Sequence, residues 1–102
     1  MPERKPKRLP PIHPGEILQE LLNEAGLSVN ALALALRVPA NRVGAIVKGQ
    51  RGISGDTALR LARYFGSSPQ LWMNLQASYD LALAADALRA KIEREVLPRS
   101  AA

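Results

Sequence analysis

Two short amphipathic segments joined by only about three residues constrain the fold of this chain more than any other feature. The first follows Ser28, a good helix N-cap, and its apolar residues recur at the spacing i, i+3, i+4, i+7 as far as Leu36. Residues 37–39 interrupt it, because the residue before a proline resists the α conformation. The second segment covers residues 39–48 and ends at Gly49. Two short helices joined so tightly, the second of them basic, fit the helix-turn-helix plan.

The second segment has a core-facing side and an outward side of unusually small residues. Its inward residues are Val43, Ile46 and Val47, and its outward residues are Ala40, Asn41, Gly44 and Ala45. A DNA major groove about 12 Å wide just accepts an α-helix, so small residues on the outward side would let the helix approach the bases closely. A helix that only filled a core would gain nothing from such a face.

This arrangement predicts which side chains face DNA. Asparagine pairs with an adenine edge, and alanine methyls contact thymine methyls. Basic side chains at the helix end and in the next loop bind phosphates. The predicted base-facing residues are Ala40, Asn41 and Ala45, and the predicted phosphate-facing residues are Arg42, Lys48 and Arg51. Six such phosphate contacts per dimer predict a slope of log K against log salt near −5. The alternative is a capped helix in a packing motif that binds no DNA.

Charge and composition agree with an anionic partner. The 102-residue chain carries a net charge of +5, with +3 in residues 1–13 and +5 in residues 37–65. Its length suits one domain with a modest core. Cysteine is absent, which excludes disulfides and thiol catalysis. There is no signal-peptide apolar run and no stretch long enough to span a bilayer, so we expect a cytoplasmic protein with no membrane partner.

The remaining periodicity is helical throughout, which predicts an all-α fold. Helices are expected over residues 14–25, with Gly26 at the end, and from Ser54 or Gly55 to residue 65. A fifth begins with Pro69 and has a pattern that continues towards Val96; whether it is one helix or two is left open. The expected division is a basic, flexible arm (1–12), a helix-turn-helix domain (13–81) and a C-terminal helical extension with a tail (82–102).

Four quoted segments resemble a known family. These are HPGEIL (13–18), LALALRVPANRV (32–43), GISGDTALRLARYFG (52–66) and WMNLQASYDL (72–81). In this order they resemble the HigA-type antitoxins, which belong to the lambda-repressor-like (XRE) helix-turn-helix superfamily. The resemblance implies a five-helix DNA-binding domain, a homodimer and autorepression of the protein's own pseudo-palindromic promoter. It also implies neutralisation of a HigB or RelE-like toxin that cleaves mRNA.

The dimer and toxin surfaces are less sharply indicated. A two-fold dimer would read half-sites one DNA turn apart, and its expected interface is on the fifth helix. The candidate interface residues are Trp72, Leu75, Tyr79, Leu88 and Ile92. The alternative is that Trp72 and Leu75 only complete the monomer core. The acidic stripe of Glu16, Glu20 and Glu24 would complement a basic toxin, although such a stripe is also typical of a solvated helix face.

An enzyme is the contrasting class, and the residues argue against it. His13 is the only histidine, beside a helix start, where capping or packing is its expected role. No nucleophile–base pair, metal-ligand cluster or phosphate-binding glycine motif is indicated, so no cofactor, metal or small-molecule substrate is expected. Two other functions stay open: a stand-alone XRE-type repressor without a toxin, and a scaffold that binds only protein.

Overall fold

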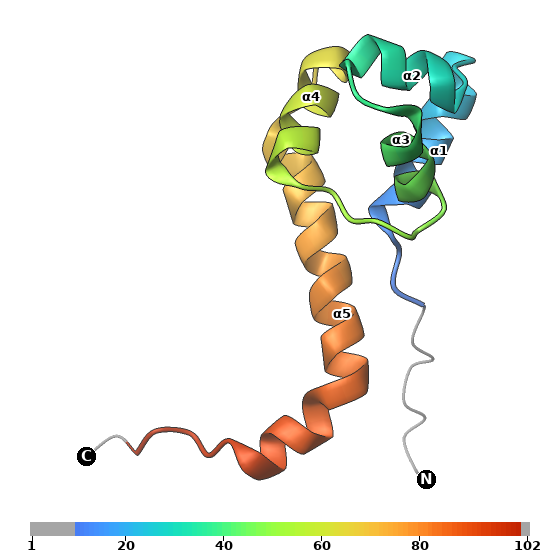
Figure 1. The fold of residues 1–102 in the computed structure, drawn as a ribbon. Helices are drawn as coiled ribbons and strands as arrows, with labels where there is room; N and C mark the ends of the chain where they lie inside the picture. The colour runs from blue at the N-terminus through green and yellow to red at the C-terminus, as the bar shows by residue number, and fades with distance from the viewer. Residues whose placement is uncertain (1–9, 101–102) are drawn as a thin grey trace, which may run out of the picture.

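The computed structural model describes residues 10–100, and within this range it contains five helices and no strand. The helices are α1 (Pro14–Ala25), α2 (Val29–Leu36), α3 (Ala40–Val47), α4 (Gly55–Phe65) and α5 (Pro69–Glu95). The prediction of an all-α, five-helix fold is confirmed. Figure 1 shows α1 to α4 gathered around the beginning of α5, whose second half extends away from them.

The helix ends follow the local signals in the sequence. His13 caps α1: its Nδ1 accepts the Gly15 N–H at 2.9 Å, and Glu16 accepts the His13 N–H at 3.0 Å. The serines before α2, α4 and α5 (Ser28, Ser54 and Ser68) each accept a backbone N–H of the first turn. The expected capping role of His13 is therefore confirmed. Its ring also packs edge-on against the ring of Tyr79, with the two ring centroids 4.8 Å apart.

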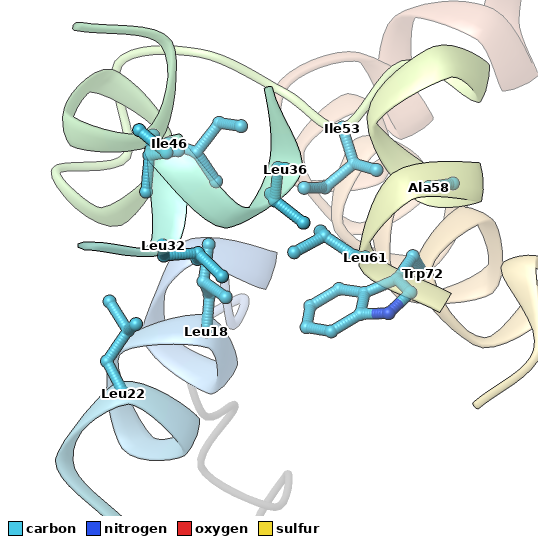
Figure 2. Packing of buried hydrophobic residues seen from close by; sticks show 11 residues of the cluster. Leu18, Leu22, Leu32, Leu36, Ile46, Ile53, Ala58, Leu61 and Trp72 are labelled. Carbon is cyan, nitrogen blue, oxygen red and sulfur yellow. The ribbon is translucent and has the colours of Figure 1, made fainter. Parts of the chain in front are cut away.

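One continuous core holds the first four helices against the beginning of α5 (Figure 2). Its largest fully buried side chains are Trp72, Leu18, Leu22, Leu32, Ile46, Leu61 and Val43. Trp72 is 0 % exposed, so the prediction that it lies in a dimer interface is wrong. The alternative, that it completes the monomer core, is the one that the structure supports. Leu75 packs against the same cluster and is half-buried.

The fifth helix is a single helix of 27 residues, which answers the question that the sequence left open. Residues 82–95, part of the expected C-terminal helical extension (82–102), continue α5 without a break. Of the predicted N-terminal arm, residues 1–9 lie outside the described residues, and residues 10–12 form no helix. No helix in residues 10–100 has both the length and the apolar character that crossing a bilayer requires.

Candidate nucleic-acid interface

The turn between α2 and α3 depends on Arg37. This residue has φ 61°, in the left-handed region, and is the one non-glycine residue with positive φ among residues 10–100. The Arg37 N–H donates to the Leu34 carbonyl at 3.2 Å, and the Val38 N–H donates to the Ala33 carbonyl at 3.0 Å. These bonds end α2 and redirect the chain within three residues. Sequence reasoning attributed the break to Pro39 alone and missed the left-handed residue.

The inward side of α3 is fixed by the core of the same chain. Val43 and Ile46 are fully buried, and α3 packs mainly against α2 and α1. The backbone of α1 comes so close that a Cβ on Gly15 would overlap the carbonyl oxygen of Ile46. The orientation of α3 is therefore set by contacts that tolerate little displacement.

The outward side of α3 is accessible. Ala40 and Asn41 are exposed, whereas Ala45 and Gly44 are half-buried. A Cβ on Gly44 would meet only Val29 Cγ1, at 3.9 Å, which is an ordinary contact. No bulky side chain of the described residues therefore covers the face that was predicted to meet the bases.

Two of the three predicted phosphate-binding cations lie at the far end of this face. Lys48 is the C-cap residue of α3, Arg51 lies in the following loop, and both are exposed. The Gln50 N–H donates to the Ala45 carbonyl at 2.9 Å, and Gly49 takes a positive φ of 74°. Both cations are therefore presented just beyond the last turn of α3.

The loop that carries Arg51 is tied to α5 by Gln76, a residue whose role sequence reasoning missed. Gln76 Oε1 accepts the Ile53 N–H at 2.7 Å, and its Nε2 donates to Asp80 Oδ1 at 2.9 Å. The bond to Ile53 joins residues 23 positions apart, and no sequence motif signals a bond at that distance. It links the candidate DNA surface to the helix that carries the candidate dimer surface.

Arg42 differs from the other two cations. Its Nη1 lies 2.6 Å from Asp56 Oδ2 on α4, so the side chain is directed across to α4 and not out from the α3 face. The Arg42 guanidinium, and then that of Arg60, hold the pKa of the Asp56 carboxyl below its ordinary value of 3.8. The structure thus pairs Arg42, a predicted phosphate-facing residue, with Asp56, a partner that the sequence analysis missed.

The other predicted residues are spread over two further surfaces. Glu20 and Glu24 are exposed on α1, whereas Glu16 is also occupied in the capping box. On the second half of α5, Leu88 and Ile92 are exposed. A shallow groove of about 490 Å³ on that part of α5 is lined by Leu81, Ala84, Ala85, Arg89, Ile92 and Glu93. The structure does not bring the three surfaces together into one site.

Comparison with known proteins places this geometry in a family. The helix-turn-helix family matches residues 18–72, which is more than half of the chain. Virulence-associated protein I of Dichelobacter nodosus is 57% identical over 77 residues, or 74% of this chain and 71% of that protein.

Solved structures agree with this result. The Pseudomonas aeruginosa antitoxin HigA with the higBA promoter has a TM-score of 0.85 and 55% identity, and the match covers 88% of this chain and 99% of that one. An addiction module antidote protein of the HigA family from Coxiella burnetii has a TM-score of 0.84 and 51% identity. That match covers 89% of this chain and 100% of the other. The chain therefore belongs to the helix-turn-helix family and, within it, to the HigA type.

Proposed function

We propose that this chain is the antitoxin of a type II toxin–antitoxin module. In this role it is a dimeric repressor of its own promoter that also binds and neutralises a RelE-like, mRNA-cleaving toxin of the HigB kind in the cytoplasm. The observation that carries the proposal is the accessible face of α3, where Ala40 and Asn41 are exposed and the cations Lys48 and Arg51 follow. The proposal assigns no catalytic step, cofactor or metal to the chain.

DNA binding is the best supported part. The small outward residues allow the axis of α3 to approach the floor of a major groove, and Asn41 has the donor and acceptor that an adenine edge requires. Ala40 and Ala45 would meet thymine methyls, while Lys48 and Arg51 neutralise phosphates. The Pseudomonas aeruginosa HigA, 55% identical to this chain, was solved with promoter DNA, which supports the same partner here.

We infer a homodimer for two reasons. One α3 helix with a single asparagine contacts few bases, and α5 carries exposed apolar side chains. Leu81, Leu88 and Ile92 recur at helical spacing along one side and are all exposed in the monomer. A second copy would cover them and place two α3 helices on half-sites about 34 Å apart. With Trp72 in the core, the proposed interface consists of Leu88 and Ile92, with Leu75 and Tyr79 at its inner end.

The toxin contact is proposed on α1, where Glu20 and Glu24 are exposed beside Glu16. A toxin that handles mRNA is expected to be basic, and acidic side chains complement it. A chain in which all three glutamates are replaced by lysine should fail to retain the product of the neighbouring gene in a pull-down. Full retention would remove this surface from the proposal.

The test of the proposed function is a mobility shift with the DNA upstream of the chain's own gene. We expect a shift of that DNA at concentrations where random DNA is not shifted, and sedimentation at twice the 11.0 kDa chain mass. Absence of any shift would favour the protein-only scaffold. A shift without binding to the product of any adjacent gene would favour the stand-alone repressor.

A further inference from the structure

Three charged side chains form a connected group at the junction of α2, α3 and α4. Asp56, in the first turn of α4, binds Arg42 of α3 through Oδ2 at 2.6 Å. Arg60 Nε donates to both oxygens of Asp56 at 3.1 Å, and Arg60 Nη1 donates to the Leu36 carbonyl at the end of α2 at 2.8 Å. One carboxylate is therefore shared by two guanidinium groups.

The two arginines are held differently. Arg60 has three contacts, two to Asp56 and one to a backbone carbonyl that α2 leaves without a partner inside the helix. The Arg42 guanidinium contacts Asp56 through a single nitrogen. Arg60 therefore anchors the carboxylate, and the carboxylate in turn holds Arg42, whose side chain is 24% exposed against 53% for Asp56.

This difference matters for DNA binding, because affinity for any DNA sequence is dominated by cations that are free to neutralise phosphates. A guanidinium already paired with a carboxylate is a poorer phosphate ligand, since binding would require exchange of one anion for another. Of the three predicted phosphate ligands in each copy, only Lys48 and Arg51 remain free. Four contacts per dimer predict a salt slope near −3.5, against about −5 for six.

We propose that Asp56 sets the strength and the salt dependence of DNA binding, by holding Arg42 away from the phosphate backbone. The inference rests on the proposed function, because it assumes that α3 meets DNA. Its effect is to lower affinity for operator and random DNA alike, because phosphate contacts are independent of sequence, and it leaves the reading of base edges by Asn41 unchanged. Asp56 is thus a positioning residue that acts through Arg42.

The test uses the full-length protein and four variants: Asp56→Asn, Arg42→Ala, the double variant, and Glu95→Gln. The last changes the net charge by the same amount at the far end of α5 and is the matched control. Affinities for own-promoter DNA and for random DNA are measured from about 50 to 200 mM salt, the range over which phosphate contacts dominate. Thermal unfolding of each variant reports separately on the fold.

For Asp56→Asn we expect a slope on random DNA that is steeper by about two units per dimer. This equals an additional, roughly tenfold loss of random-DNA affinity across that salt range. At the lowest salt the affinity for both DNAs should rise by a similar factor, so the ratio of operator to random affinity should not change. In the Arg42→Ala background, the same substitution should change the slope no more than Glu95→Gln does.

Three results would overturn the inference. An unchanged slope, or a loss of affinity for both DNAs at the lowest salt, would mean that Asp56 only stabilises the fold. The full change persisting without Arg42 would mean that Asp56 acts by its own charge. If the unsubstituted protein binds neither DNA, the proposed function fails and the assignment of Asp56 falls with it; the first two results leave the proposed function intact.

Discussion

The outward face of α3 and the second half of α5 are both exposed helical surfaces, but they differ in chemistry and in support. On α3 the exposed residues are small or polar, and Val43 and Ile46 anchor the opposite side in the core. On α5, Leu81 is 71% and Ile92 is 48% exposed, and no residue from 80 to 95 is buried. A rigidly held face of small and polar side chains suits binding to a nucleic acid. An apolar face that does not pack against its own chain suits binding to a second copy of the protein.

The largest effect is expected where α1 supports α3. Gly15→Ala would place a methyl group on the carbonyl oxygen of Ile46, and both groups belong to packed helices that cannot move apart cheaply. We expect a loss of about 3 kcal/mol or more in the free energy of unfolding. Chemical denaturation measures it, with Gly55→Ala as the control, since a Cβ there meets nothing within 4 Å. An equal effect of both substitutions would show that α3 is not held by this contact.

The next effect concerns α5. Leu88→Asp with Ile92→Asp should leave the helix content intact but put charges on the proposed dimer face. A monomer loses the second half-site, so we expect operator affinity to fall by about 100-fold. Sedimentation and operator titration measure both consequences, and Leu34→Asp on α2, where the leucine is 75% exposed, controls for an acidic substitution elsewhere. A double variant that remains dimeric would assign the interface to another surface.

Gly44→Ala separates stability from binding on α3. The added methyl makes only an ordinary contact with Val29 Cγ1, at 3.9 Å, and alanine favours the helix, so stability should rise by about 1 kcal/mol. The same methyl stands on the face that meets the groove, so operator affinity should fall. Thermal unfolding and a mobility shift on one preparation give both values. If stability and operator affinity rise together, DNA does not approach this face closely.

The smallest effect concerns the pH dependence of the contact between α3 and α4. Because Arg42 and Arg60 lower the pKa of Asp56 in the folded protein, its charged form stabilises the fold above about pH 3.8. This contribution is lost as the pH falls through the lower folded pKa. The difference in Tm between the wild type and Asp56→Asn should therefore be largest near neutral pH and shrink below about pH 3.8. A constant difference from neutral to acidic pH would contradict the ion pair.

Local signals account for what the sequence predicted well. The bounds of α1 and the capping role of His13 depend on residues within four positions of one another, so they could be read directly. The long-range contacts could not. Arg42 meets Asp56 across 14 positions and Gln76 meets Ile53 across 23, and each contact depends on how whole helices are placed.

The same reason explains the error at Trp72. Its spacing with Leu75 and Tyr79 identified one side of α5 correctly as apolar. Periodicity does not show whether such a side faces the chain's own core or a partner. For α5 the answer changes along the helix: Trp72 is buried, whereas Leu88 and Ile92 are exposed.

The most direct test of the account is the effect of Asn41→Ala on two DNAs. Asn41 is exposed and makes no contact that holds the fold, so its removal should leave stability unchanged. If the outward side of α3 reads bases, binding to the chain's own promoter should weaken by ~1–3 kcal/mol per half-site, and binding to random DNA should not change. Equal weakening on both DNAs, or none on either, would contradict it.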